Sequence, residues 1–525
     1  MKLNKLSFAD TRAFSSFFLD YIEQKETLKP FYNRFPQTEN FAAQLADKSQ
    51  AFPQQNRDIL ADVLVQQYTS VPVKQAVQQN IAALRDTKTF TVITGHQLNI
   101  FTGPLYFIYK IVTVINACKQ LKKQYPEYTF VPVYWMASED HDYDEIKYFK
   151  LYGKKYTWQT EQTGAVGRFS TQDIKSLLQE VPGDTRIFQE AYTKNKTLAD
   201  AVRHYVNTLF GDEGLAVVDA DNATLKSLFK KVIHQDIFEN ISKKFVDKTN
   251  EALQQKGYHT QVYCRDINFF YLDKNLRSRI EKSGDDTWKV LDTDISFSSA
   301  ELKKLIEEQP ERFSPNVILR PLYQEVILPN LAYVGGPAEV VYWLQLKGVF
   351  DHFKVPFPML MPRNFAMVME HTVTRKFEKT GLELKDLFED KNYIFNHWVL
   401  EHSTHNLTVG PERTQVHELF EELKKRSDAI DKTLTAYISA EGKRALNSLE
   451  KIERKLLRAE KRLHKDKLGQ IEAVKDALFP NGSLQERTDN FLNFYQRDSN
   501  FIQRLYEQFD PFDYKFNVLS YTADL

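Results

Sequence analysis

The stretch that decides the fold begins with Thr89-Phe-Thr-Val-Ile-Thr94 and ends with Thr129-Phe-Val-Pro-Val-Tyr-Trp-Met136. Both runs are short and rich in β-branched and aromatic residues, as buried strands are. Between them, residues 95–103 form a loop, and apolar residues then recur at helical spacing from Leu105 to Lys123. Because this helix is apolar on two sides, we expect it to be buried. Strand, loop, helix and strand in this order predict an α/β fold with a parallel sheet.

The sequence around this unit predicts how the sheet continues. Further short strands are expected at three places: Gly214-Leu-Ala-Val-Val-Asp219, Val317-Ile-Leu319 and Tyr333-Val334. We predict one sheet core over residues 86–375, with more polar insertions near 150–210 and 240–312. Residues 1–85 have a polar, helical pattern without a catalytic motif, and we expect them to pack on the core.

The C-terminal part of the chain has long helical patterns. After a connector at 376–410, we predict a helical hairpin over 411–512 that turns at Phe479-Pro-Asn-Gly482, and then a tail at 513–525. Before that turn, apolar residues step by three and four, the spacing of a coiled coil: Leu449, Ile452, Leu456, Ala459 and Leu463. A projecting arm cannot bury such a seam alone, so we expect a partner chain.

Composition excludes several classes of protein. A chain of 525 residues is long enough for roughly two to four domains. Lys+Arg and Asp+Glu both number 70, so no overall charge favours a nucleic-acid partner. The excess of Lys and Arg over 443–467 fits either a nucleic-acid surface or, as we favour, the solvated face of a coiled coil. Two cysteines, Cys118 and Cys264, exclude a disulfide scaffold. Without an apolar segment of signal-peptide or membrane-spanning length, we expect a cytoplasmic protein.

The first candidate site is Thr94-Gly-His-Gln-Leu-Asn-Ile-Phe-Thr-Gly-Pro104, which joins a strand to the start of the buried helix. Ligands bind at such strand ends in open α/β sheets, and a helix N-terminus attracts phosphate or carboxylate. The candidate ligand-binding residues here are Thr94, Gly95, His96, Gln97, Asn99, Thr102 and Gly103. The loop matches neither the P-loop nor the GxGxxG pattern. The alternative is a structural turn that uses glycine for backbone freedom.

The second candidate site is Ser138-Glu-Asp-His-Asp142, with Asp144 and Glu145 just beyond it. It follows the second strand, so it lies at the same edge of the sheet as the first loop. Its candidate residues are Glu139, Asp140, His141 and Asp142, which could orient an amine, accept a proton or bind Mg²⁺. The alternative is a solvated acidic turn that caps the next helix.

The third candidate site consists of Arg320-Pro-Leu-Tyr-Gln324 and Tyr333-Val-Gly-Gly-Pro-Ala-Glu339. Its candidate residues are Arg320, Gln324, Tyr333, Gly335, Gly336 and Glu339. Arg320 could hold a carboxylate or phosphate through two hydrogen bonds, or form a structural salt bridge. Lys110, in the buried helix, either points into the site or pairs with a carboxylate. His402 and His405 lack a third ligand, so we expect no metal site.

Five segments in order resemble the family of bacillithiol biosynthesis cysteine-adding enzymes. They are Thr94-Gly-His-Gln…Phe-Thr-Gly-Pro-Leu-Tyr106, Val131-Pro-Val-Tyr-Trp-Met-Ala-Ser-Glu-Asp-His-Asp142, Ser314-Pro-Asn-Val-Ile-Leu-Arg-Pro321, Leu328-Pro-Asn-Leu-Ala-Tyr-Val-Gly-Gly-Pro337 and Leu478-Phe-Pro-Asn-Gly-Ser-Leu-Gln-Glu-Arg487. The resemblance implies a Rossmann-like core, related to nucleotidyltransferases and class I aminoacyl-tRNA synthetases, with insertions and a C-terminal coiled coil that forms homodimers. His96 and Asn99 depart from the Gln and Gly that many members have.

The resemblance implies a ligase that joins L-cysteine to the amine of glucosaminyl malate. A carboxylate does not condense with an amine in water without activation, so we expect ATP·Mg²⁺ to supply an adenylate or acyl phosphate, although the Lys-Met-Ser-Lys-Ser motif of synthetases is absent. In this scheme His96 and Gln97 orient the activated group, Asp140 or His141 accepts the amine proton, and Arg320 holds a substrate carboxylate. The alternatives are a nucleotidyltransferase that acts on another small acid, or a nucleotide-binding coiled-coil protein without catalysis.

Overall fold

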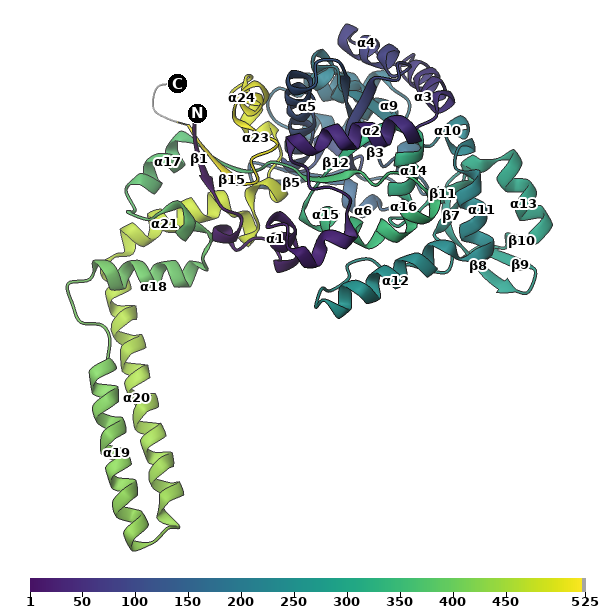
Figure 1. Cartoon of the computed structure of the whole chain (residues 1–525). Coiled ribbons are helices and arrows are strands. Elements are labelled where there is room, and N and C mark those ends of the chain that lie inside the picture. The colour runs from purple at the N-terminus through teal and green to yellow at the C-terminus, as the bar shows by residue number, and fades with distance from the viewer. Residues whose placement is uncertain (522–525) are drawn as a thin grey trace.

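A five-stranded parallel sheet lies at the centre of the computed structural model, which describes residues 1–521 (Figure 1). Its strands are β2 (Thr89–His96), β3 (Thr129–Met136), β6 (Ala216–Asp219), β12 (Asn330–Gly335) and β13 (Met359–Pro362). They lie side by side in the order β13-β12-β2-β3-β6. Numbered along the chain, this is the order 5-4-1-2-3 of a Rossmann-like sheet, and it confirms the predicted fold class. The order reverses between β2 and β12, and ligands bind at the carboxyl ends of strands beside such a reversal.

The helix α5 (Tyr106–Gln124) connects β2 to β3 and packs against both strands. Its two predicted apolar sides are buried, and none of these side chains is more than 4% exposed: Leu105, Phe107, Ile108, Ile111, Val112, Val114, Ile115, Cys118 and Leu121. The sequence reading of a buried crossover helix is therefore confirmed. Of the other expected strands, β6 and β12 are present where the apolar runs predict them.

The strand expected at Val317–Leu319 is not formed. The backbone N–H of Ile318 donates to the side-chain oxygen of Asn316 (2.9 Å), and the N–H of Arg320 donates to the carbonyl of Asn316 (2.9 Å). These bonds turn the chain into α14 (Arg320–Ile327). Asparagine favours such turns because its side chain replaces a backbone acceptor. The short strand β11 (Phe313–Pro315) lies just before the turn.

The N-terminal segment is mostly helical, as predicted, and it covers the sheet. Its helices are α1 (Ser16–Ile22), α2 (Phe41–Ala51), α3 (Gln54–Gln67) and α4 (Gln75–Ala83). Lys48 of α2 forms an ion pair with Glu325 of α14 (2.8 Å), and both side chains are at most 1% exposed. A buried charge pair of this kind fixes the position of α2, because either charge alone in the interior would be costly.

Two insertions interrupt the sheet core. The first contains α6 (Tyr143–Ile146), β4 (Tyr148–Leu151), β5 (Lys154–Thr157), α7 (Ile174–Glu180) and α8 (Arg186–Lys194). It ends earlier than predicted, because α9 (Leu198–Phe210) is largely buried and packs against β6. The second insertion carries an antiparallel sheet in the order β10-β9-β8-β7-β11.

The elements of the second insertion and of the return to the core follow in chain order. They are α10 (Ala223–Ser227), α11 (Lys230–Glu239), α12 (Ile241–Gln255), β7 (Phe269–Asp273), β8 (Leu276–Gly284), β9 (Thr287–Val290), β10 (Ser296–Ser298) and α13 (Ser299–Glu308). After β12, the chain forms α15 (Pro337–Trp343) and α16 (Lys347–Phe353). The insertion thus leaves the core after β6 and returns to it through β11.

A third sheet joins the two ends of the described chain. β1 (Lys2–Leu6) pairs antiparallel with β15 (Phe516–Ser520), which pairs parallel with β14 (Phe365–Met369). Residues predicted as a C-terminal tail therefore form a central, buried strand. The predicted connector contains α17 (His371–Glu378) in part and α18 (Lys391–His402) in full.

The projecting arm is shorter than the predicted hairpin over 411–512. It consists of α19 (Gly410–Ile430) and α20 (Leu434–Leu463), which lie antiparallel and extend away from the core (Figure 1). Its tip is a turn in which the side chain of Asp431 accepts a hydrogen bond from the backbone N–H of Thr433 (2.8 Å). The tip is therefore at 431–433 and not at the Pro-Asn-Gly sequence.

The Pro-Asn-Gly sequence does make a turn, but it returns the chain to the core. It follows α21 (Lys465–Leu478) and precedes α22 (Gln485–Thr488), α23 (Leu492–Tyr495) and α24 (Phe501–Gln508). The reason is long-range hydrogen bonding to β14: Gln485 accepts from the N–H of Val368 (2.7 Å), and Glu486 accepts from that of Ala366 (3.1 Å). None of the helices in residues 1–521 is both long and apolar enough to span a bilayer.

Candidate active site

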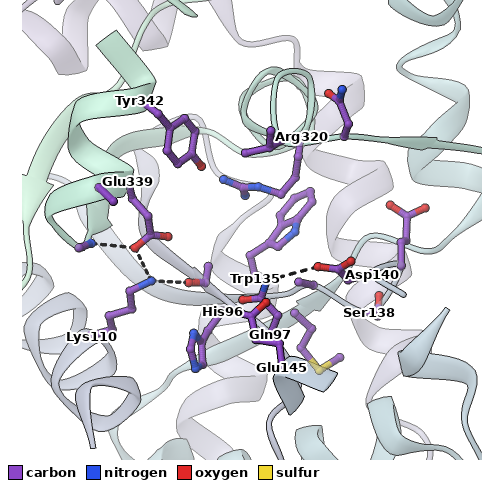
Figure 2. A pocket seen from close by; sticks show the side chains of 18 of the residues that line it. His96, Gln97, Lys110, Trp135, Ser138, Asp140, Glu145, Arg320, Glu339 and Tyr342 are labelled. Atoms are coloured by element: carbon purple, nitrogen blue, oxygen red, sulfur yellow. Dashed lines mark hydrogen bonds and ion pairs between the residues drawn. The ribbon is translucent and has the colours of Figure 1, made fainter. Parts of the chain in front are cut away.

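A cavity of about 580 Å³ opens at the carboxyl ends of β2 and β12, where the strand order reverses (Figure 2). All three candidate segments contribute to its lining. The predicted residues that line it are Gly95, His96, Gln97, Glu139, Asp140, His141, Arg320, Tyr333, Gly336 and Glu339. A volume of this size suits a small-molecule substrate. The structure therefore brings together the residues that the strand-end argument selected.

The rest of the first loop does not reach the cavity. The side chain of Thr94 donates to the carbonyl of Val334 (2.8 Å), and that of Asn99 donates to the carbonyl of Glu145 (2.9 Å). Thr102 is 1% exposed, and Gly103 lies outside the cavity lining. These four residues act as the structural turn that was the alternative interpretation.

The start of α5, expected to bind phosphate, is covered by the C-terminal segment. The backbone N–H of Leu105 donates to the carbonyl of Asp489 (2.7 Å). The side chain of Asn490 donates to the carbonyls of Phe101 (2.7 Å) and Gly103 (2.6 Å). The N–H of Phe101 donates to the hydroxyl of Tyr192 (2.9 Å). Because the N–H groups of Phe101 and Leu105 are already paired, they are not available to an anion, and the expectation of phosphate binding there is not supported.

Three further predicted residues also lie outside the lining. Asp142 caps α6, accepting a hydrogen bond from the N–H of Glu145 (3.2 Å). Gln324 accepts one from Arg320 (3.1 Å) and so supports a lining residue from behind. Gly335 ends β12 just before the lining residue Gly336. These three residues shape the site without facing a ligand.

Glu339 connects the two strand ends across the cavity floor. Its carboxylate accepts hydrogen bonds from Tyr333 (2.6 Å) and the N–H of Gly336 (2.7 Å) and pairs with Lys110 (2.6 Å). Lys110 also donates to the carbonyl of Gly95 (2.8 Å). Burial alone would raise the pKa of Glu339, but Lys110 and the other donors lower it to about 2. Both interpretations of Lys110 therefore hold, since it pairs structurally and lines the site.

His96 is a neutral imidazole at the wall of the cavity. It is 7% exposed, and its ring contacts those of Tyr106 and Phe107. Burial, and then the charge of Lys110, lower the pKa of His96 to about 3. Its Nε2 has no hydrogen-bond partner among the described residues. A buried polar atom without a partner beside a cavity is suited to meet a ligand group.

Arg320 extends into the cavity between aromatic rings. Its guanidinium lies 5.8 Å from the ring centroid of Trp135, 5.6 Å from that of Tyr333 and 5.8 Å from that of Trp343. No carboxylate within residues 1–521 lies at ion-pair distance from it. Since a guanidinium is always charged and matches a carboxylate in shape, Arg320 is available to an anionic ligand.

Asp140 and His141 line the cavity from the loop that follows β3. Gln97 donates to Asp140 Oδ2 (3.3 Å), as Figure 2 shows, and the N–H of His141 donates to Asp140 Oδ1 (2.8 Å). The first insertion clamps the same loop, because Val166 N donates to the carbonyl of Asp140 (2.7 Å) and Gly167 N to that of Ser138 (2.8 Å). The loop is therefore held in one conformation by the core and by the insertion.

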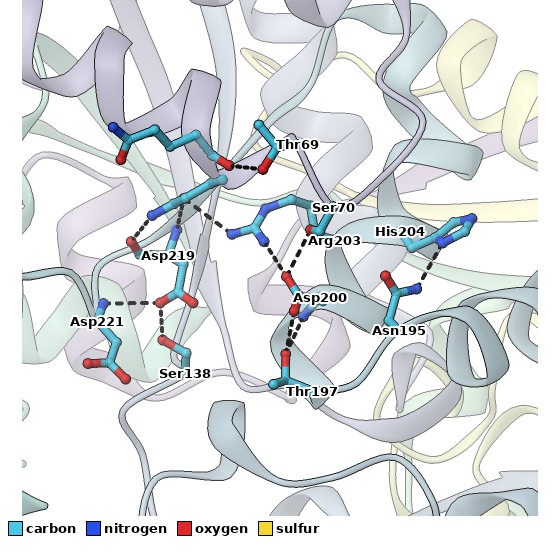
Figure 3. Close-up of polar contacts among 12 residues, drawn as sticks. Thr69, Ser70, Ser138, Asn195, Thr197, Asp200, Arg203, His204, Asp219 and Asp221 are labelled. Carbon is cyan, nitrogen blue, oxygen red and sulfur yellow. Dashed lines mark hydrogen bonds and ion pairs between the residues drawn. The ribbon is translucent and has the colours of Figure 1, made fainter.

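A polar network fixes the base of this loop from the side of β6 (Figure 3). Ser138 donates to Asp219, which also accepts from the N–H of Asp221 (3.0 Å). Glu139 pairs with the buried Lys226. Burial raises the pKa of Glu139 to about 7, against the opposing effect of Lys226. Glu139 is therefore a structural carboxylate at the edge of the cavity.

Several lining residues were not predicted from the sequence. They are Tyr106, Trp135, Glu145, Phe270, Arg277, Tyr342, Arg363 and Arg487. Trp135, Tyr106 and Arg487 lie inside the quoted segments but were not assigned to the site. Arg277 and Phe270 belong to the second insertion, and no pattern in the sequence relates that polar segment to the sheet edge. Only the three-dimensional fold reveals them.

No cluster that could hold a metal ion is formed by the His, Cys, Asp and Glu residues of the described chain. His405 and His464 both approach Glu460, at 3.2 Å and 3.3 Å, at the base of the arm. His402 instead stacks on Trp398. Cys118 and Cys264 are free and buried, and burial raises the pKa of the Cys264 thiol to about 12.

Comparison with known proteins gives matches over nearly the whole chain. Residues 1–364 match the family described as bacillithiol biosynthesis BshC, N-terminal Rossmann-like domain, and residues 366–521 match its C-terminal coiled-coil domain. A protein of Flavobacterium psychrophilum is 40% identical over 99% of this chain and 100% of its own length. Proteins of Cytophaga hutchinsonii (40% identity, 99% of each chain) and Salinibacter ruber (32%; 93% of this chain, 92% of its own) also match. All three are provisionally named cysteine ligase BshC.

Proposed function

Because the chain belongs to the bacillithiol biosynthesis BshC family, we propose that it joins the carboxyl group of L-cysteine to the amine of glucosaminyl malate. The enzyme is a ligase that forms a C–N bond, in keeping with its relatives. The observation that carries the proposal is the cavity at the strand reversal, which is lined by both Arg320 and Asp140. The cavity thus offers a cation for a carboxylate and a carboxylate for an amine.

Each group has a role that its surroundings permit. Arg320 holds a carboxylate of malate or cysteine, since its guanidinium is free of any described acidic partner. His96 and Gln97 orient the reacting carboxyl group by hydrogen bonds, because His96 is neutral and has an unpartnered Nε2. Asp140 or His141 accepts the proton of the attacking amine. Lys110 and Glu339 keep β2 and β12 at a fixed separation below these groups.

ATP with Mg²⁺ is the proposed activator of the cysteine carboxyl group. The support is chemical, since an amide does not form from a carboxylate and an amine without a better leaving group. Arg320 and Arg487 are the cavity guanidiniums that could hold phosphate oxygens, whereas Arg363 is already paired with Glu486 (2.6 Å) and Arg277 with Asp140 (3.5 Å). Mg²⁺ often takes only one or two protein carboxylates and keeps its waters, so the absence of a larger cluster from residues 1–521 is compatible with this scheme.

The bond-forming step replaces a C–O bond with a C–N bond. The amine nitrogen attacks the carbonyl carbon of the activated cysteine and forms the new C–N bond. The C–O bond to the phosphate leaving group breaks, and its electron pair stays on the phosphate oxygen. The proton lost by nitrogen passes to Asp140 or His141. Fixed donors around the reacting carbonyl lower the barrier because they need not reorganise.

The test is a reconstitution with L-cysteine, glucosaminyl malate and ATP·Mg²⁺, read by mass spectrometry for bacillithiol. One control omits ATP, and a second replaces the acceptor with its N-acetylated form, which has no free amine. We expect product only in the complete mixture. Product without ATP would overturn the activation scheme and retain the ligation. No product in any mixture would contradict the proposed pair of substrates.

Alanine variants test the site itself. H96A, D140A and R320A should each reduce kcat/KM, with D140A losing about 10²- to 10⁴-fold if Asp140 is the proton acceptor. The matched control is Arg279→Gln, which removes an arginine from β8 outside the cavity lining. Full activity in all three alanine variants would exclude this cavity as the site of the reaction.

The arm is proposed to form a homodimer. On α20, the predicted seam residues Ile452, Leu456 and Leu463 are 48%, 40% and 72% exposed, so α19 does not cover them. A second arm is the proposed cover for this apolar stripe, since large exposed apolar surfaces usually mark protein contacts. We place the enzyme in the cytoplasm, where a thiol substrate and the two free cysteines stay reduced.

A further inference from the structure

Arg277 enters the active-site cavity from the second insertion. It lies on β8 opposite Leu272 of β7, so it shares a face of this small sheet with Phe270, its diagonal neighbour. Its guanidinium lies 4.0 Å from the centroid of the Phe270 ring, and its side chain is only 8% exposed. Both residues line the cavity. The second insertion thus supplies a buried cation to the cavity.

The hydrogen bonds of Arg277 determine the state of His141. Arg277 Nη1 lies 2.6 Å from His141 Nδ1, and Arg277 Nε donates to the hydroxyl of Ser314 (3.1 Å). Because arginine has five N–H donors and no acceptor, His141 Nδ1 must be the acceptor. The neutral imidazole then carries its proton on Nε2. His141 therefore presents a hydrogen-bond donor, and its only lone pair is already engaged.

The charges around His141 favour the same neutral form. On its own loop it is faced by Asp140 and Asp142, and from β8 by Arg277. Arg277 also pairs with Asp140 (Nη1 to Oδ1, 3.5 Å) and lies close to Glu139. Burial, and then the charge of Arg277, lower the pKa of His141, while the two aspartates raise it. The arginine thus offsets the aspartates that would otherwise favour an imidazolium ion.

We propose that Arg277 is a positioning residue that holds His141 as the neutral Nε2–H tautomer, so that His141 donates a hydrogen bond to the substrate and Asp140 accepts the amine proton. The tautomer of His141 is a property of the free enzyme. The division of roles between His141 and Asp140 rests on the proposed function. It resolves which of the two neighbours acts as the base, since a histidine without a free lone pair cannot take a proton.

Acylation by diethyl pyrocarbonate tests the tautomer of His141, because this reagent needs an unprotonated nitrogen with a free lone pair. The rate at each histidine is read by peptide mass spectrometry on the full-length protein between pH 6 and pH 8. His234 is the internal reference, since its side chain is 43% exposed and that of His141 is 47% exposed. We expect His141 to react at least tenfold more slowly than His234 in the wild type.

Variants of the same strand identify the cause. Arg277→Gln should accelerate acylation of His141 at least tenfold, and Arg277→Lys, which keeps a donor, should accelerate it less. Arg279→Gln is the matched control, because Arg279 is on the same strand and pairs with Glu281 outside the cavity lining. It should leave the rate unchanged. Equal rates in wild type and Arg277→Gln, with both proteins folded by circular dichroism, would overturn the tautomer assignment.

Turnover separately tests the division of roles between His141 and Asp140. In Arg277→Gln, kcat should fall, and the pH profile of kcat/KM should gain an acid limb that reports the freed His141. Arg277→Lys should restore part of kcat. Unchanged kcat and pH profile in Arg277→Gln, despite faster acylation, would overturn the division of roles between His141 and Asp140. Lack of turnover in the wild type would contradict the proposed function and leave the acylation result intact.

Discussion

The helix α5 in the core and the helix α20 in the arm carry similar apolar patterns, yet their surroundings differ. Both have apolar residues at helical spacing. In α5 both apolar sides are at most 4% exposed, because the sheet and the C-terminal segment cover the helix. α20 meets α19 where Gly442 lies close to Phe420, but Ile452, Leu456 and Leu463 of its seam are exposed. Apolar spacing therefore predicts a helix but does not tell what covers it.

The two regions also use charge differently. In the core, Lys48 and Glu325 are paired with side chains at most 1% exposed. In the arm, Arg413 and Glu450 are paired with side chains 43% and 37% exposed. Water already stabilises the charges of the arm, whereas each core charge depends on its partner. Loss of an ion-pair partner should thus lower the free energy of unfolding much more in the core than in the arm.

The largest effect is expected from Glu325→Gln, which leaves Lys48 buried without its partner. We expect a loss of about 3–5 kcal/mol in the free energy of unfolding. The matched change in the arm, Glu450→Gln, should cost at most about 1 kcal/mol. Urea unfolding followed by tryptophan fluorescence and circular dichroism measures both. Equal losses in the two variants would contradict the contrast between core and arm.

The second test concerns the exposed stripe of the arm. The double variant Ile452→Glu/Leu456→Glu should weaken the proposed dimer about 100-fold, because two apolar side chains contribute about 3 kcal/mol on burial. Sedimentation velocity over a range of concentrations measures the association. Val65→Glu is the control, since Val65 is 56% exposed on the core. A double variant that dimerises as tightly as wild type would show that this stripe is not the interface.

A smaller effect is expected inside the cavity. His96→Gln keeps a neutral hydrogen-bonding group, so kcat/KM should fall by no more than about tenfold, or about 1.4 kcal/mol. Because burial lowers the pKa of His96 to about 3, the pH profile above pH 5 should not change. His96→Ala should lose more. A wild-type profile with an acid limb that disappears in His96→Gln would show that His96 titrates in the working range.

The smallest effect concerns Lys475, at the root of the arm on α21. It donates to the carbonyl of Leu387, and burial lowers its pKa to about 8. Above pH 8 the unfolded chain therefore binds more protons than the folded one, and stability rises with pH. Because Lys475 is only partly buried and solvent screens its charge, we expect it to contribute at most about 0.5 kcal/mol between pH 8 and pH 9.

The comparison that isolates Lys475 is wild type against Lys475→Met at each pH. The difference in unfolding free energy should shrink as pH rises through this range. Lys443→Met, at an exposed position of the arm, is the control and should keep a constant difference from wild type. A constant difference for Lys475→Met as well would mean that the root of the arm is as solvated as the arm itself.

The sequence was most informative where local pattern and fold coincide. The run from β2 through α5 to β3 was predicted because buried strands and a helix apolar on two sides have few other solutions. The sheet edge then followed from the rule that parallel strands end together, and it located His96, Asp140, Arg320 and Glu339 around one cavity. Their roles in the reaction stay predictions that the variants above test.

The predictions that the structure did not confirm failed for a common physical reason. Long-range hydrogen bonds decide these regions, and a single sequence does not reveal them. The start of α5 looked like an anion site, but the N–H of Leu105 already donates to the carbonyl of Asp489, far along the chain. The Pro-Asn-Gly turn looked like the tip of a hairpin, yet Gln485 pairs with β14 and draws the chain back to the core. Arg277 is one charged residue in a polar strand, and only its contact with His141 distinguishes it.

The sheet β1-β15-β14 constrains the order in which the chain can fold during its synthesis. The partners of Lys2–Leu6 are Phe516–Ser520, so β1 is synthesised long before the strand with which it pairs. During that interval β1 is an unpaired strand, which is a surface prone to wrong pairing. β2 and β3, by contrast, pair with each other and are close in sequence. The final pairing then closes the molecule only after the arm has been made.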